Sequence, residues 1–84
     1  MKYLVDVDVM PLDELLDPQG KVINQSLEKL GMNQIENVRI GKHIRFTVEA
    51  ADEKTAHDQV EEACKKLLAN LIMEKYEITL KAIG

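Results

Sequence analysis

The chain has 84 residues, 45% of them hydrophobic and 31% charged, with a formal net charge of −4. This size suits one domain over residues 1–84, and the acidic balance argues against a nucleic-acid partner, whose phosphates call for a basic surface. The single cysteine excludes an internal disulfide and fits a reducing compartment. No apolar run approaches the roughly 20 residues that cross a bilayer, so we expect no membrane partner.

The first predicted element is a strand over residues 2–10, because apolar and polar side chains alternate there. One face of this strand carries Tyr3, Val5, Val7 and Val9, and the other carries Asp6 and Asp8. Pro11 lacks the backbone N–H that a sheet needs, so the strand should end there.

A helix is predicted to begin at Asp17-Pro18, an N-cap residue followed by proline at the first helical position. Its apolar face comprises Val22, Ile23, Leu27 and Leu30, and Gly31 suits its C-terminus. Gly20 in the first turn costs about 1 kcal/mol relative to alanine. We therefore expect Gly20 to allow the close approach of another backbone segment.

Residues 35–50 predict two strands joined by a tight turn at Gly41-Lys42, because apolar residues alternate on both sides of that turn. A second helix is predicted over residues 52–69, with Cys64 on its apolar stripe as a core residue rather than a reactive thiol. Tyr76, Ile78 and Leu80 alternate with polar residues and predict a last strand.

The element order strand-helix-strand-strand-helix-strand predicts an α+β fold, a two-layer ferredoxin-like sandwich (βαββαβ). A four-stranded antiparallel sheet would carry two helices on one face, with the first strand between the third and the fourth. On the uncovered face, Asp6 and Asp8 would lie near His43 and Arg45 on one side and near Lys81 on the other. Two interpretations stay open: a solvated polar face, or a surface that packs against a second copy.

The sequence offers no convincing set of catalytic residues. His43 and His57 lack a partner motif, one cysteine and two scattered histidines lack the spacing of a zinc site, and no glycine-rich loop could hold a phosphate. The carboxylates between residues 53 and 62 are typical of a solvated helix face. We therefore expect no catalytic, cofactor-binding or metal-binding residues in this chain.

Three segments carry a more specific signal. Residues 16–20 (Leu-Asp-Pro-Gln-Gly) open the first predicted helix, residues 38–42 (Val-Arg-Ile-Gly-Lys) surround the predicted central turn, and residues 64–70 (Cys-Lys-Lys-Leu-Leu-Ala-Asn) end the second predicted helix. Together with Glu74 and Tyr76, they resemble the PurS family, the small subunits of phosphoribosylformylglycinamidine (FGAM) synthase. The resemblance covers essentially the whole chain. It departs at residues 10–15, where such chains often carry a shorter, more basic connection.

The resemblance implies a non-catalytic subunit of a cytoplasmic complex of purine biosynthesis, which uses ATP, glutamine and formylglycinamide ribonucleotide. In such a complex a glutaminase subunit releases ammonia and a large synthetase subunit consumes it. The small chain, as a homodimer and in some cases a tetramer, joins the two and assists ammonia transfer. No cofactor is implied for this chain, because the synthetase subunit uses the ATP and magnesium.

The same segments supply the candidates for a partner interface: Asp17, Pro18, Gln19, Gly20, Arg39, Gly41 and Lys42. Helix capping explains Asp17 and Pro18 equally well, and a hairpin turn explains Gly41 and Lys42 equally well. Gln19 and Arg39 have no evident structural role, so we expect them to contact a partner, with Arg39 able to form a bidentate pair with a carboxylate.

Two other functions remain open on the sequence alone. One is a ligand-sensing regulatory dimer of ferredoxin-like domains, which specific stabilisation by a small molecule without protein partners would favour. The other is a small hydrolase that uses the two histidines and the carboxylates, which replacement of both histidines without effect would exclude.

Overall fold

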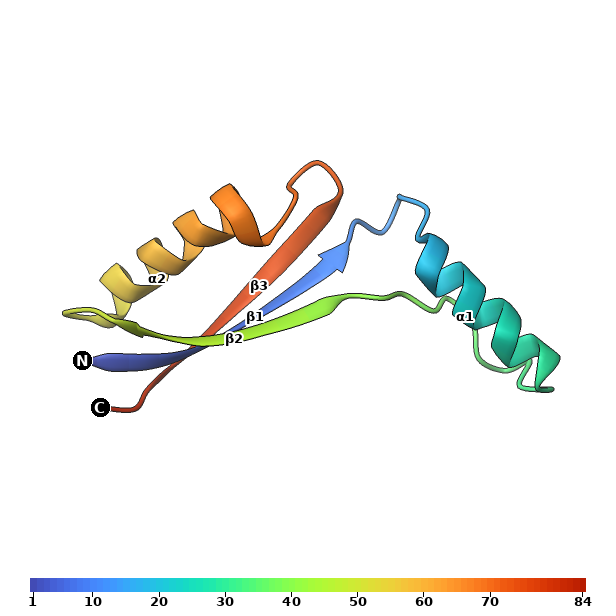
Figure 1. The fold of residues 1–84 in the computed structure, drawn as a ribbon, viewed down its shortest axis with the longest axis horizontal. Helices are drawn as coiled ribbons and strands as arrows, with labels where there is room; N and C mark the ends of the chain where they lie inside the picture. Colours follow the sequence, from blue (N-terminus) through green and yellow to red (C-terminus); the bar gives the residue numbers. More distant parts are fainter.

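Strand β1 (Lys2–Pro11) is the central strand in a computed structural model that describes residues 1–84 (Figure 1). It pairs antiparallel with β2 (Lys42–Glu49) on one side and with β3 (Glu74–Ala82) on the other. The predicted central position of the first strand is therefore confirmed. Val7 lies opposite Ile44 and Ile78, so the apolar residues of all three strands share one face of the sheet.

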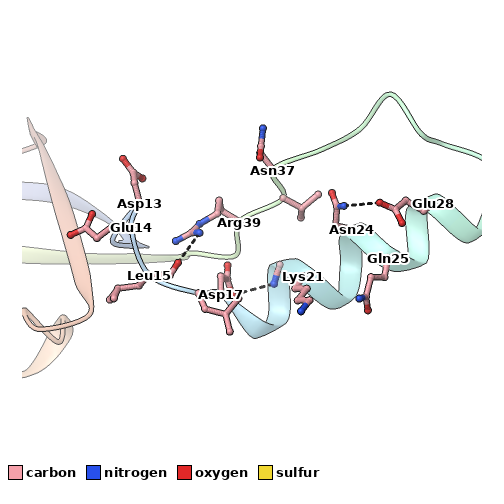
Figure 2. A pocket seen from close by; sticks show the side chains of 13 residues that line it. Asp13, Glu14, Leu15, Asp17, Lys21, Asn24, Gln25, Glu28, Asn37 and Arg39 are labelled. Atoms are coloured by element: carbon pink, nitrogen blue, oxygen red, sulfur yellow. Dashed lines mark hydrogen bonds between the residues drawn. The ribbon is translucent and has the colours of Figure 1, made fainter.

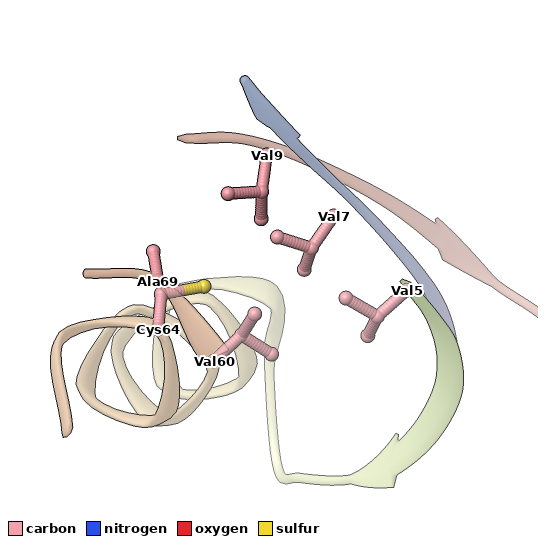
Figure 3. Close-up of a cluster of buried hydrophobic side chains, with 6 residues drawn as sticks. All are labelled: Val5, Val7, Val9, Val60, Cys64 and Ala69. Carbon is pink, nitrogen blue, oxygen red and sulfur yellow. The ribbon is translucent and has the colours of Figure 1, made fainter. Parts of the chain in front are cut away.

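Helix α2 (Glu53–Ala63) covers this apolar face and continues into a π-helical turn, η1 (Cys64–Leu68). Asp52 caps the helix by accepting a hydrogen bond from the Thr55 N–H at 2.7 Å. Figure 3 shows Val60 and Cys64 against the three valines of β1, all of them buried. The predicted core role of Cys64 is thus confirmed, and burial raises the pKa of its thiol.

The predicted four-stranded sheet is wrong, because the sheet has three strands. The segment before β2, residues 35–41, joins no strand. Its backbone is engaged elsewhere, since the Ile40 N–H donates to the side chain of Asp17 at 2.7 Å. Gly41 likewise does not form a hairpin turn. It lies against β1, where an added Cβ would overlap the side chain of Met10.

Helix α1 (Pro18–Lys29) does not lie on the sheet, so a ferredoxin-like sandwich is not confirmed. Residues 12–41, here called the arm, carry α1 away from the end of the sheet opposite to the chain termini (Figure 1). The molecule measures 52 × 26 × 14 Å, and its radius of gyration of 16.5 Å exceeds the roughly 12 Å of a compact domain of this length. None of its helices has the length and apolar character that crossing a bilayer requires.

Candidate interaction site at the base of the arm

Asp17 fastens the arm by joining the start of α1 to the segment that returns to β2. One carboxylate oxygen accepts from the Gly20 N–H at 3.1 Å, which caps α1, and the other accepts from the Ile40 N–H at 2.7 Å. The backbone hydrogen bonds from Ile40 and Gly20 hold the pKa of Asp17 below its ordinary value. Pro18 follows at the first helical position. The capping interpretation of Asp17 and Pro18 is therefore confirmed, with a second bond that the sequence could not show.

Gly20 sits where α1 and the returning segment touch. It is buried, and a Cβ at this position would overlap the carbonyl oxygen of Val38. The expected close approach of another backbone is confirmed, and the approaching segment is residues 37–39. The absence of a side chain at Gly20 is therefore what allows α1 to lie against this segment.

Arg39 has a structural role that the sequence did not reveal. Its guanidinium donates to the carbonyl oxygens of Leu12 at 2.7 Å and Leu15 at 3.0 Å, as Figure 2 shows for Leu15. These bonds tie the connection after β1 to the segment before β2. The acceptors are backbone atoms, so no side-chain pattern at residues 12–15 could have indicated them. The Arg39 Nε atom is buried without a hydrogen-bond partner.

Gln19 and Lys42 differ from Arg39 because both side chains are exposed. Gln19 borders a shallow, mainly apolar hollow on one side of α1 together with Pro18, Val22, Ile23 and Ile40. Lys42 is the first residue of β2 and lies opposite Val9. The structure thus brings six of the seven candidates together at the junction of arm and sheet, with Lys42 next to them at the start of β2.

Besides the apolar hollow, the junction of arm and sheet also forms an open polar groove of about 860 Å³ (Figure 2). Its lining includes carboxylates and amides from the connection after β1 and from α1, among them Asp13, Glu14, Asn24 and Glu28. Asn24 donates to Glu28 at 3.3 Å, while its own buried carbonyl oxygen has no partner. Neither a histidine nor a cysteine lines the groove.

A second polar cluster lies on the sheet face away from α2. His43 contacts Asp8 at 2.6 Å through Nδ1 and Asp6 at 3.0 Å through Nε2, and Arg45 contacts Asp6 at 2.7 Å. The predicted proximity of Asp6 and Asp8 to His43 and Arg45 is confirmed, whereas Lys81 lies opposite Leu4 and pairs with neither aspartate. The hydrogen bonds to Asp8 and Asp6 raise the pKa of His43.

This raised pKa predicts a pH-dependent stability. The contribution of His43 is fully present below its ordinary pKa of about 6.5 and is lost as the pH rises through the higher folded value. We expect a small fall in Tm above pH 6.5 that His43→Gln abolishes, and that salt weakens because the cluster is exposed. Thermal unfolding between pH 6 and pH 9 measures this, and an equal pH dependence in both chains would contradict it.

A third cluster, on α2, comprises His57, Asp58 and Glu61, whose potential ligand atoms lie within 4.8 Å of one another. Lys54 contacts Asp58 at 3.0 Å and Lys65 contacts Glu61 at 3.5 Å. Ammonium groups from neighbouring turns therefore already pair with both carboxylates, as on an ordinary solvated helix face.

The geometry defines a small α+β protein whose distinctive feature is a helical arm held rigidly beyond its sheet. The family model of PurS, phosphoribosylformylglycinamidine (FGAM) synthase, matches residues 4–82. The chain belongs to the PurS family. The predicted resemblance is thereby confirmed, and with it the prediction of a subunit of FGAM synthase.

Individual relatives agree with this assignment over most of their length. The FGAM synthase subunit PurS of Synechocystis sp. is 42% identical over 69 residues, which are 82% of this chain and 69% of that protein. The PurS subunit of Bacillus subtilis is 36% identical over 81 residues, 96% of this chain and 95% of that protein.

Solved structures share the shape of the chain, including the arm. The structure of B. subtilis PurS superposes with a TM-score of 0.87, at 36% identity, over 95% of this chain and 99% of that chain. A chain in the structure of PurLQS from Thermotoga maritima gives a TM-score of 0.87, at 30% identity, over 96% of this chain and 99% of that chain.

Proposed function

We propose that this chain is a non-catalytic bridging subunit of the FGAM synthase complex, which joins the glutaminase subunit to the ATP-dependent synthetase subunit and assists ammonia transfer between them. The observation that carries the proposal is the match to a chain of PurLQS, which extends over 96% of this chain and includes the arm. A rigid arm that no part of its own chain covers suits a subunit that works by contact.

A bridge has a chemical purpose in such a reaction. Ammonia that reaches bulk water near neutral pH is mostly protonated, and ammonium has no lone pair with which to attack an activated amide. A short path that excludes water preserves the nucleophile. Fixing the two larger subunits to each other also raises the effective concentration of ammonia at the synthetase site. Both tasks need surface and rigidity rather than a reactive side chain.

The proposal extends to cofactors, partners and location. The chain itself binds no cofactor, because the synthetase subunit holds the ATP and magnesium. Its protein partners are a second copy of itself, in a homodimer that can associate further into a tetramer, and the two larger subunits. We place this complex in the cytoplasm, with no nucleic acid and no membrane among the partners.

Within this proposal, six of the seven candidate interface residues differ in whether they contact a partner directly or act through the arm. Gln19 and Lys42 are exposed and free to contact a partner directly. Asp17, Gly20 and Arg39 act through the arm, because their bonds and contacts within the chain hold α1 in place. Pro18 serves both purposes, since it starts α1 and borders the apolar hollow.

Reconstitution from separately purified subunits tests this function. We expect the isolated chain to have neither glutaminase nor synthetase activity, and to associate with both larger subunits in a defined stoichiometry. Added to them, it should restore glutamine-dependent synthesis of the amidine. Synthesis from added ammonium salt should depend far less on the chain, because the synthetase subunit then needs no transfer. No association under any nucleotide condition would contradict the proposal.

A further inference from the structure

Residues 67–73, here called the apolar turn, run from the end of η1 to the start of β3 and expose four large apolar side chains: Leu67, Leu71, Ile72 and Met73. Leu67 and Ile72 are 83% and 84% exposed, more than any other large apolar residue of the chain. None of the four belongs to a core cluster. Apolar side chains that gather on the surface in this way mark a contact with another molecule.

Hydrogen bonds hold the backbone of the apolar turn in one shape. The Asn70 side chain accepts from the Ile72 N–H at 3.1 Å. The Asn70 carbonyl oxygen accepts from the Met73 and Glu74 N–H groups at 3.0 and 2.7 Å, and the Glu74 carboxylate accepts from the Asn70 N–H at 2.7 Å. The Leu12 N–H donates to the Met73 carbonyl oxygen at 2.9 Å, which ties the turn to the connection after β1. The turn therefore presents its side chains in a fixed arrangement, which lowers the entropy cost of binding.

The apolar turn lies beside the base of the arm, at the end of the sheet from which the arm departs (Figure 1). Met73 borders a pocket of about 290 Å³ together with Leu16 and Gln19 of the arm. Leu16 is a further exposed apolar residue, and Gln19 is the exposed residue predicted to contact a partner. The apolar turn thus continues the candidate interaction site across the end of the sheet.

Carboxylates surround this combined surface. Asp13 and Glu14 are exposed on the connection after β1, and Asp17 and Glu74 border the pocket. Lys75 contacts Asp13 at 3.1 Å and so offsets one of these four charges. The surface therefore combines an apolar centre with an acidic edge.

The charges indicate which kind of partner fits. The lysines of η1 do not offset the acidic edge, because Lys65 and Lys66 already pair with Glu61 and Glu62 on the preceding turn. A second copy of the chain, in a symmetric contact, would bring the same carboxylates to this surface, and like charges would oppose the contact. A different protein with an apolar pocket edged by lysine or arginine matches both the side chains and the charge.

We infer that the apolar turn docks into an apolar pocket with a basic edge on one of the two larger subunits, with Leu71 and Ile72 inside the pocket. Gln19 lies at the edge of the same contact. The inference rests on the proposed function and deepens it, because it assigns to the bridging subunit a surface for one of its partners.

The main test is truncation of the two central side chains. Binding to the purified glutaminase and synthetase subunits, each alone and both together, is measured by isothermal titration calorimetry. The double variant Leu71→Ala/Ile72→Ala should bind one of them roughly a hundredfold more weakly, because two side chains lose apolar area that the contact buries. Its Tm should stay that of the original chain, since neither residue belongs to a core cluster.

The matched control is Ile83→Ala. Ile83 is 49% exposed, compared with 50% for Leu71, but lies at the opposite end of the sheet beside the chain termini (Figure 1). This replacement also removes an exposed aliphatic side chain, so it should leave both the Kd and the Tm unchanged. An equal loss of affinity in Ile83→Ala would contradict a contact centred on the apolar turn.

Two further variants test the fixed shape and the charge separately. Asn70→Ala removes the acceptor for the Ile72 N–H but keeps both aliphatic side chains, so it should weaken binding about threefold to tenfold. Glu14→Lys reverses a charge on the acidic edge and should slow association with little effect on dissociation, which surface plasmon resonance resolves. Faster association of Glu14→Lys would show that the partner surface is acidic and would overturn the inference.

The outcomes separate the inference from the proposed function. If the double variant bound both larger subunits as tightly as the original chain does, the inference would fail and the proposed function would stand. If sedimentation equilibrium showed that the double variant loses self-association while it still binds the larger subunits, the contact would lie between copies, which also overturns the inference. If the original chain bound neither subunit, the proposed function would fail as well.

Discussion

Gly20→Ala is expected to destabilise the chain by about 1–3 kcal/mol, although alanine normally stabilises the interior of a helix by about 1 kcal/mol relative to glycine. The reason is steric, since the new Cβ would overlap the Val38 carbonyl oxygen and push α1 away from the returning segment. Denaturant unfolding measures the loss, and small-angle X-ray scattering should show a less ordered arm.

The control is Ser26→Ala, which lies on the same helix at an exposed position. This change should be neutral or slightly stabilising, because only helix propensity is altered. If Gly20→Ala raised the stability as much as Ser26→Ala does, the close contact between α1 and residues 37–39 would not hold the arm. The same Gly20→Ala chain should also support less glutamine-dependent synthesis in the reconstituted complex, since the arm carries the proposed contacts.

Arg39→Ala is expected to lower the stability of the chain, whereas Gln19→Ala is expected to weaken only its assembly with the larger subunits. Arg39→Ala removes both hydrogen bonds to the Leu12 and Leu15 carbonyls and should cost about 1.5–3 kcal/mol, which lowers the Tm of so small a chain by roughly 10 °C. Gln19→Ala removes no contact within the chain, so its Tm should hardly change while assembly with the larger subunits weakens. Thermal unfolding and co-purification of each variant separate the two effects.

Arg39→Lys supplies a further control. A lysine ammonium group lacks the planar fork with which the guanidinium reaches both carbonyls, so the Tm of Arg39→Lys should also lie below that of the original chain. An unchanged Tm in Arg39→Ala would instead support the prediction from sequence, in which Arg39 contacts a partner and has no structural role. The double replacement of Gln19 and Arg39 by alanine should destabilise the chain as much as Arg39→Ala alone, because Gln19 makes no side-chain contact that stabilises the fold.

The parts of the fold that follow from local pattern were predictable. Alternation over β1 identified Val5, Val7 and Val9 as core residues, and helical spacing placed Cys64 against them. The fourth strand was predicted wrongly because alternation describes only side chains. Whether residues 35–41 form a strand depends on the partners of their backbone groups. One of these groups, the Ile40 N–H, donates to the carboxylate of Asp17, which lies 23 positions earlier in the chain. Such a long-range competition leaves no periodic signal.

In the candidate site, too, the sequence pattern indicated some features, whereas long-range backbone contacts determined others. The motif residues Asp17, Gly20 and Arg39 were predicted to contact a partner, and the structure shows that all three hold the arm in place. Their contacts are with backbone groups: the Gly20 and Ile40 N–H groups for Asp17, the Val38 carbonyl for Gly20, and the Leu12 and Leu15 carbonyls for Arg39. Backbone carbonyls have the same chemistry at every position, so no residue type marks them. The detached position of α1 was likewise not predictable, because an apolar helical face does not say which surface it packs against.

In the proposed role, this chain couples two larger subunits and carries out no chemistry itself. The most direct measurement is the rate of amidine formation by the glutaminase and synthetase subunits as the chain is titrated, once with glutamine and once with ammonium salt as the nitrogen source. For a bridging subunit, the glutamine-driven rate should rise to saturation at a fixed subunit ratio, while the ammonium-driven rate should stay nearly constant. Equal dependence of both rates on the chain, or turnover by the chain alone, would contradict it.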